Sequence, residues 1–280
     1  MEISLTTTTL GIVNLKTIPN IINNLNSKIE LSSNCYFDCS DINLSKFRNK
    51  LNIHNYSPRP KDPFVLNLAS QDKETISQSI KMIESNINLS SSLNSKYYSL
   101  HAGYASDIKP EMLGKKITSQ SYDCRKNTYD LFKERCKLIS KKALKKGVRI
   151  LIENNVVGKK NMDSGKSGLL FLSEIDEIYS FSVEMQKYCG LLLDVGHLKV
   201  SARNYKFDLE KAIFKIAPYV EGIHLSDNKG EEDTNEYIEK DFWFLPYFKL
   251  FTSLKYIGLE TKPASNAKII DMYYLIQSSI

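Results

Sequence analysis

The segment GLLLDVGH, residues 190–197, is an apolar run that ends in polar side chains able to bind a metal ion. A continuous run of this kind favours a strand buried on both faces of a parallel sheet, because a half-exposed strand alternates apolar and polar residues. Seven further β-rich runs make eight strand candidates in all, and they cover residues 2–10, 28–33, 51–56, 96–103, 148–155, 220–228 and 256–263.

Amphipathic segments separate the strand candidates. The clearest helical patterns cover residues 75–95, 122–146 and 173–188. Eight strands in 280 residues give about 35 residues for each strand–helix unit, and eight such units close into a barrel in the (β/α)8 fold. We therefore predict the α/β class, with a single (β/α)8 TIM-barrel domain over residues 1–280 and an open doubly wound sheet as the alternative.

The composition is typical of a globular protein, with 42% apolar and 25% charged residues. No apolar run approaches the roughly 20 residues of a membrane span, and the chain does not begin with a basic segment and an apolar core. The cysteines form no CxxC pair and are interpreted as reduced thiols: Cys35, Cys39, Cys124, Cys136 and Cys189. We expect a cytoplasmic protein without membrane contact. The sequence does not decide whether it is a monomer or a homo-oligomer.

Charge and motifs restrict the partners further. The net charge of +6, from 38 basic and 32 acidic residues, is mild, and it disfavours a nucleic-acid partner without excluding one. No GxGxxG or GxxxxGKS motif follows a strand candidate, so we expect no nucleotide cofactor.

Five strand candidates end in residues that can bind a metal ion. The carboxyl ends of barrel strands converge on one mouth, so these side chains should meet in space. A single carboxylate at such a place can instead cap the next helix, but the shared position favours a joint site for a divalent ion such as Mn²⁺, Mg²⁺, Co²⁺ or Zn²⁺. The residues are His101, Glu153, Asp194, His197, His224, Asp227 and Glu260.

Four motifs in this order resemble the xylose isomerase-like TIM-barrel superfamily: ILIEN at 150–154, LLDVGH at 192–197, GIHLSDN at 222–228 and GLETK at 258–262. That superfamily contains sugar and sugar-phosphate isomerases and epimerases, and also endonuclease IV. The resemblance implies a carbohydrate or sugar-phosphate substrate. It also implies one divalent ion held by Glu153, Asp194, His224 and Glu260, with Glu153 and Glu260 as the catalytic acid and base of an enediolate mechanism.

Other functions remain open. The segment 53–70 resembles the part of endonuclease IV that carries a metal-binding histidine, which matches His54 here, and His101 matches a second histidine of that family. Asp227 and Asp233 fall near acidic positions of the same family. This resemblance implies extra metal ligands at His54, Asp227 and Asp233 and a multi-metal phosphodiesterase. Asn235 stands where that family has a further histidine. A metal-dependent sugar dehydratase and a non-catalytic sugar-binding barrel are further alternatives.

Several residues are candidates for substrate binding. By resemblance, His197 matches a histidine that contacts substrate. His101 ends a strand, Lys262 follows Glu260 by two residues, and Trp243 lies between two phenylalanines. Weaker candidates are Tyr104, Asn154 and Glu30.

Overall fold

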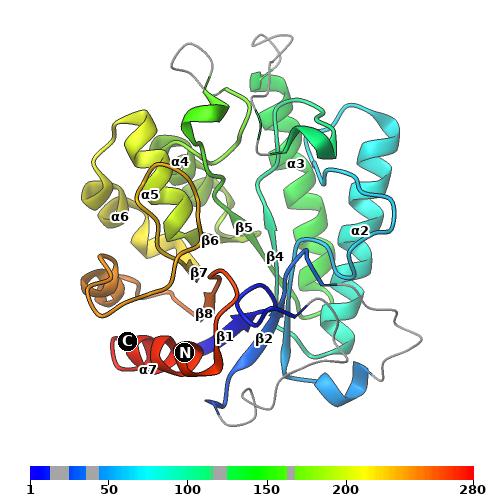
Figure 1. The fold of residues 1–280 in the computed structure, drawn as a ribbon. Coiled ribbons are helices and arrows are strands. Elements are labelled where there is room, and N and C mark those ends of the chain that lie inside the picture. The colour runs from blue at the N-terminus through cyan, green and yellow to red at the C-terminus, as the bar shows by residue number, and fades with distance from the viewer. Residues whose placement is uncertain (13–24, 36–43, 114, 116–124, 163–167) are drawn as a thin grey trace.

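Eight parallel strands close into a barrel in the computed structural model, which describes residues 1–12, 25–35, 44–113, 115, 125–162 and 168–280 (Figure 1). Each strand pairs with the next along the chain, and β8 pairs with β1. This confirms the predicted (β/α)8 fold. The strands are β1 (Glu2–Thr6), β2 (Lys28–Leu31), β3 (Leu51–His54), β4 (Tyr97–His101), β5 (Arg149–Glu153), β6 (Gly190–Asp194), β7 (Val220–Leu225) and β8 (Tyr256–Leu259).

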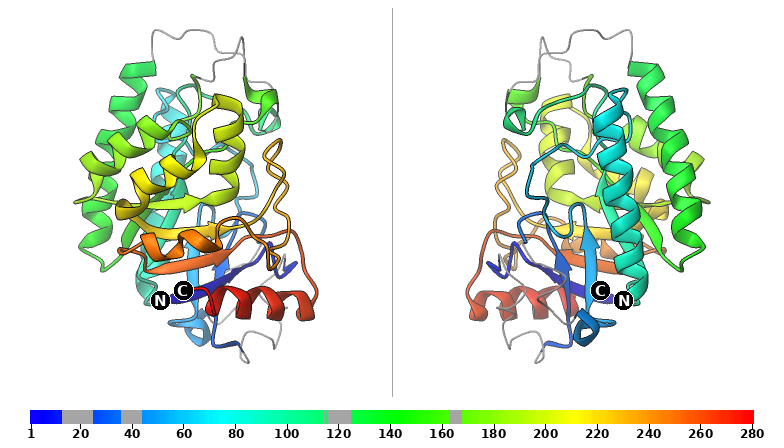
Figure 2. Two further views of the ribbon diagram at one scale, coloured as in Figure 1. Left: turned by 90° about the vertical axis from the view of Figure 1, so that its left-hand side faces the viewer. Right: turned by 90° about the vertical axis from the view of Figure 1, so that its right-hand side faces the viewer.

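Helices lie on the outside of the barrel, as the two side views in Figure 2 show, and among the described residues a 3-10 turn takes the place of a helix after β2 and after β7. The helical spacing of Tyr129, Phe132, Cys136, Ile139 and Ala143 predicts one apolar face on α3. The last four are buried there and Tyr129 is half-buried, because this face packs against the barrel. The helices are α2 (Lys73–Ser92), α3 (Arg125–Leu144), α4 (Ile175–Met185), α5 (Val195–Tyr205), α6 (Leu209–Ile216) and α7 (Asn266–Gln277), and the 3-10 turns are η2 (Leu44–Phe47), η3 (Pro110–Met112), η5 (Lys159–Asn161), η6 (Ala217–Tyr219) and η7 (Leu245–Leu250).

The strands are shorter than the sequence pattern predicts. The candidate 190–197 ends as a strand at Asp194, because the Asp194 carboxylate caps α5 and accepts a hydrogen bond from the His197 backbone. His197 therefore lies in the first turn of a helix. The candidate 2–10 ends as a strand at Thr6, where the chain turns and the Leu10 N–H bonds back to the Thr6 carbonyl.

Two loops at the mouth are joined through Thr9. Its hydroxyl donates to the Leu259 carbonyl at 2.7 Å and accepts from the Thr261 N–H at 2.8 Å. Thr9 is fully buried. The loop after β1 therefore fixes the backbone on both sides of Glu260.

The barrel interior is filled in layers. Side chains two residues apart on a strand share a face, so Leu151 and Leu192 lie one layer below the predicted metal ligands of their strands. With Tyr256 they form a buried apolar cluster, separate from the larger core between strands and helices. On the side of β5, β6 and β8, the predicted site therefore lies above apolar side chains.

Two predictions about the environment of the chain can be compared with the structure. No helix of the described residues combines the length and apolar character needed to cross a membrane.

Cys35, Cys136 and Cys189 are free, buried thiols. Cys39 and Cys124 lie outside the described residues.

Candidate metal centre

Strand register brings the predicted ligands to one level of the barrel. In the ladder, His101 is paired with Glu153, and Asp194 is paired with His224. Glu260 follows β8 directly, and its N–H bonds to the Leu225 carbonyl of β7. The polar strand ends inferred from the sequence are therefore neighbours in space.

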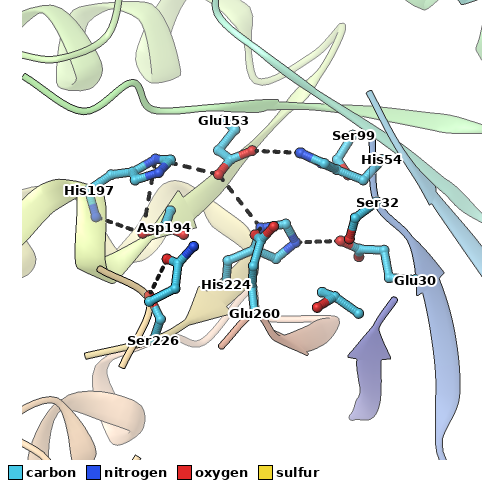
Figure 3. A network of polar contacts seen from close by, with 12 residues as sticks. Glu30, Ser32, His54, Ser99, Glu153, Asp194, His197, His224, Ser226 and Glu260 are labelled. Carbon is cyan, nitrogen blue, oxygen red and sulfur yellow. Dashed lines mark hydrogen bonds and ion pairs between the residues drawn. The ribbon is translucent and has the colours of Figure 1, made fainter. Parts of the chain in front are cut away.

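One ligand group consists of Glu153, Asp194, His224 and Glu260. One ligand atom from each of them lies within 4.8 Å of the others. His224 Nδ1 is 2.6 Å from Glu260 Oε2 and 3.6 Å from Glu153 Oε1 (Figure 3). All four side chains are buried except that of Glu260, which is 18% exposed and faces the mouth.

A second group shares Glu153 with the first and adds His54 and His101. Glu153 Oε2 lies 3.4 Å from His54 Nε2 and 3.6 Å from His101 Nδ1. The His54 ring is fixed by Ser99, whose hydroxyl is 3.0 Å from Nδ1, and by Asn55, whose amide nitrogen donates to Nε2 at 2.9 Å. Ser99 was not among the predicted residues, although it lies on the inner face of β4 two residues before His101.

The buried polar atoms of the first group fit a divalent cation. Both carboxylate oxygens of Glu153 and both ring nitrogens of His224 are buried without an aligned hydrogen bond in the described structure. Buried polar atoms normally have partners, and leaving them without one is costly. A cation bound by two glutamates, an aspartate and an imidazole would give Glu153 and one ring nitrogen of His224 a partner, and the donor set suits Zn²⁺, Mn²⁺, Co²⁺ or Mg²⁺.

The electrostatics of the group are strongly perturbed. Burial by itself raises the pKa of Glu153, but the imidazoles that face it from β3, β4 and β7 hold this pKa well below its ordinary value. Burial raises the pKa of Asp194 to about 7. Burial lowers the pKa of His101 to about 4, so this ring is neutral near pH 7, the form in which histidine binds metals.

His197 is held between the site and the loop after β7. Its Nδ1 donates to the Asn154 carbonyl at 2.9 Å, and its Nε2 lies 3.2 Å from Asp233 Oδ2. Asn154 also bonds twice to the backbone of Asp194. Asn154 therefore fixes both the end of β6 and the orientation of the His197 ring.

Asn235 does not join His197 and Asp233. Its backbone lies in the left-handed region, with φ of 47°, which asparagine tolerates better than most residues. Its side-chain oxygen accepts a hydrogen bond from Ser226. His197 and Asp233 thus face each other without a third ligand from this position.

The remaining predicted residues have other contacts. Lys262 forms an ion pair with Glu236, and Asp227 pairs with Lys199 at 2.7 Å and belongs to neither ligand group. Trp243 packs among aromatic side chains, with Lys199 over its ring. Tyr104 lines a cavity of about 160 Å³ beside the site, together with His101 and His197.

Glu30 lies at the centre of the barrel rather than at the mouth. It is fully buried on β2, and its Oε1 is 2.7 Å from His224 Nε2. The sequence offers little to single it out, because it lies within a short strand and not in a polar cluster.

A closed parallel barrel with such a cluster at the carboxyl ends of its strands defines a TIM-barrel protein with a candidate metal centre. The family described as xylose isomerase-like TIM barrel matches residues 29–271, and the chain belongs to this family. This confirms the resemblance inferred from the four motifs.

Solved structures share the fold across nearly the whole chain. An L-ribulose 3-epimerase is 12% identical with a TM-score of 0.70, and the match covers 100% of this chain and 96% of that one. A D-psicose 3-epimerase with D-tagatose from Clostridium cellulolyticum is 12% identical with a TM-score of 0.64 and the same coverage. A Thermus thermophilus protein, soaked with ZnCl₂, is 16% identical with a TM-score of 0.62 and covers 99% of both chains. The curated proteins contain no match to the chain.

Proposed function

We propose that this protein is a divalent-metal-dependent isomerase or epimerase of a sugar or sugar phosphate. The observation that carries the proposal is the convergence of Glu153, Asp194, His224 and Glu260 within 4.8 Å. The epimerases among the structures of similar fold support a carbohydrate substrate. The four residues would hold one ion, which when bound acts as a Lewis acid toward adjacent carbonyl and hydroxyl oxygens of the substrate.

Glu153 and Glu260 are the proposed acid and base. They approach the centre from β5 and β8, which are separated in the closed barrel by β6 and β7. A carboxylate on one side of the sugar would take a proton from carbon, and the carboxyl group on the other side would return one. Return to the opposite face gives epimerisation, and transfer along one face gives isomerisation.

Substrate binding is assigned to His197, His101, Lys262 and Trp243. The cavity of about 160 Å³ beside His101 and His197 is also lined by Asn155 and Tyr104, so it offers both polar and aromatic contacts to a small polyol. Lys262 would have to leave Glu236 to reach a substrate. A sugar dehydratase would use the same ligands and the same proton abstraction, and a binding-only barrel would need neither glutamate as a base.

A multi-metal phosphodiesterase is the second candidate, because the group of His54, His101 and Glu153 shares a carboxylate with the first group. Shared carboxylates are suited to two-metal sites that clamp both oxygens of a displacement. Two observations favour the first candidate. The Nε2 lone pair of His54 already accepts a hydrogen bond from Asn55, which favours a single ion. Lys199, Arg203 and Lys262 are each paired with an acidic side chain, which leaves less positive charge for the backbone of a nucleic acid.

Elemental mass spectrometry on protein purified without chelator tests the metal centre, followed by two assays on the same sample. We expect one divalent ion per chain, incorporation of solvent deuterium into a ketose or ketose phosphate, and no cleavage of abasic DNA. Two or three ions with phosphodiester cleavage and no deuterium incorporation would establish the second candidate instead. No bound ion after reloading with Zn²⁺, Mn²⁺ and Co²⁺ contradicts both.

A further inference from the structure

Glu30 is a buried carboxylate that the proposed chemistry does not use. Its side chain has no exposed surface, and no described group makes an aligned hydrogen bond to either of its oxygens. Oε1 lies 2.7 Å from Nε2 of His224, across the barrel from β2 to β7 (Figure 3). A buried carboxylate with one close neighbour has a strong influence on that neighbour, because no solvent screens it.

The contact lies at the ring nitrogen of His224 that does not face Glu260. Both ring nitrogens have a carboxylate oxygen nearby, since Glu260 Oε2 is 2.6 Å from Nδ1 and Glu30 Oε1 is 2.7 Å from Nε2. Glu260 and Glu153 belong to the ligand group, so an ion held there would take the lone pair of Nδ1, and the proton of the neutral ring would then be on Nε2, beside Glu30. A histidine that binds a metal through one nitrogen usually donates its other N–H to a carboxylate or carbonyl group.

The backbone of β8 leaves room for this pair. A Cβ atom on Gly258 would lie 2.8 Å from Cδ2 and 3.1 Å from Nε2 of His224. Glu30 Oε2 lies 3.7 Å from the same position. Any larger residue at 258 would therefore push the ring away from its place between Glu30 and the ligand group.

We propose that Glu30 is a positioning residue that holds the His224 ring from its Nε2 side and so presents Nδ1 to the metal ion. The inference rests on the proposed metal centre. Glu30, His54 and His224 could also form a ligand group of their own, since their atoms lie within 4.8 Å of one another. That arrangement would need both nitrogens of one ring to bind ions, whereas a neutral imidazole has a single free lone pair.

The test compares metal affinity in Glu30→Ala, Glu30→Gln and the wild type, by competition of Zn²⁺ or Co²⁺ with a chromophoric chelator. We expect the dissociation constant to rise by about 10–100-fold in Glu30→Ala. The amide oxygen of Glu30→Gln can still accept the Nε2 proton, so this variant should recover part of the loss. The visible absorption of bound Co²⁺ should change in Glu30→Ala, because the ligand ring is no longer fixed.

Ser32→Ala is the matched control. Ser32 is buried and lies two residues further along on the same side of the chain, without a hydrogen bond from its hydroxyl. This variant should bind the metal as the wild type does. If Glu30→Ala does not fold, as judged by circular dichroism, the isosteric Glu30→Gln is used to test the proposal. Its metal affinity should still be lower than that of the wild type, although by less than in Glu30→Ala.

Each outcome has a distinct meaning. Unchanged affinity and Co²⁺ absorption in both Glu30 variants would overturn the positioning role. If the wild type binds two ions per chain and the Glu30 variants bind one, Glu30 is itself a metal ligand, and the positioning role is also overturned. A wild type that binds no ion contradicts the proposed function itself, and this is visible before any variant is made.

Discussion

Asp194 Oδ1 accepts a hydrogen bond of 2.7 Å from the backbone N–H of His197. One carboxylate therefore caps α5 and belongs to the ligand group at the end of β6. The cap also sets the direction of His197, which faces Asp233 from the first helical turn. Substitutions of Asp194 can separate its structural contribution from its role as a ligand.

We expect Asp194→Asn and Asp194→Ala to differ in stability but not in metal binding. Asparagine caps helices about as well as aspartate, whereas alanine does not, so Asp194→Ala should lose about 1 kcal/mol more of the free energy of unfolding. Both variants lack the charged ligand and should bind Zn²⁺ more weakly. Urea unfolding with chelator present, and chelator competition without urea, measure the two effects. Equal stability of the variants would show that the cap contributes little.

Replacing Glu153 or Glu260 by Gln should strongly slow proton transfer. Loss of a general acid or base costs about 10²–10⁴-fold, so solvent-deuterium incorporation should fall by at least 10²-fold. Glu232→Gln, on the exposed loop after β7, serves as the control and should retain activity. Full activity in the Glu153 or Glu260 variant would exclude that glutamate as acid or base. If the wild type shows no turnover and both variants bind sugar with the same affinity as the wild type, a binding protein would be favoured.

The double variant His54→Ala, His101→Ala tests the number of ions. If Glu153, Asp194, His224 and Glu260 hold a single ion, the double variant should still contain one ion per chain. A saturating metal should also still raise its melting temperature, because an ion at about 100 times its dissociation constant stabilises the native state by about 2.7 kcal/mol. A wild type with two ions that falls to one in the double variant would establish the second group as a metal site.

Lys262 should contribute to substrate affinity if its ion pair with Glu236 opens and the ammonium group binds substrate. Removing a charged hydrogen-bond donor costs about 1.5–3 kcal/mol, so Lys262→Ala should raise KM roughly tenfold or more with little change in kcat. Glu236→Gln releases the lysine and should lower KM. An exposed ion pair contributes at most about 1 kcal/mol, so the stability of both variants should be close to that of the wild type. Equal KM values would leave Lys262 without a role in binding.

The buried thiols predict a loss of stability in alkali. Burial raises the pKa of Cys35 to about 11 and that of Cys189 to about 12, from an ordinary value of 9.0. The unfolded chain therefore releases these protons first, so the stability contribution is complete below pH 9 and is lost as pH rises toward 11–12. Urea unfolding from pH 8 to 10.5 in a Cys39→Ser, Cys124→Ser background measures this loss. Cys189→Ala should make it smaller, and an identical pH profile in that variant would contradict the assignment.

The strand ends made much of the centre predictable. Glu153, Asp194 and His224 each follow an apolar run, and strand register then brings them together. The partner of Lys262 was not predictable, because Glu236 lies on the loop after β7, whose path depends on tertiary contacts such as the bridge between Asp227 and Glu236. Glu30 was only a weak candidate, since a single acid within a short strand gives no pattern until the barrel closes and places it against His224.

The hydrogen bonds of Thr9 to both sides of Glu260 join the beginning of the chain to its end. During synthesis, β1 emerges long before β8, its partner in the closed sheet. Until the last strand leaves the ribosome, β1 and β7 are open edges, and such edges can pair with other chains. A fragment that stops before residue 256 would therefore lack Glu260 and expose two aggregation-prone edges, so the complete centre and protection from aggregation should be reached in the same late step of folding.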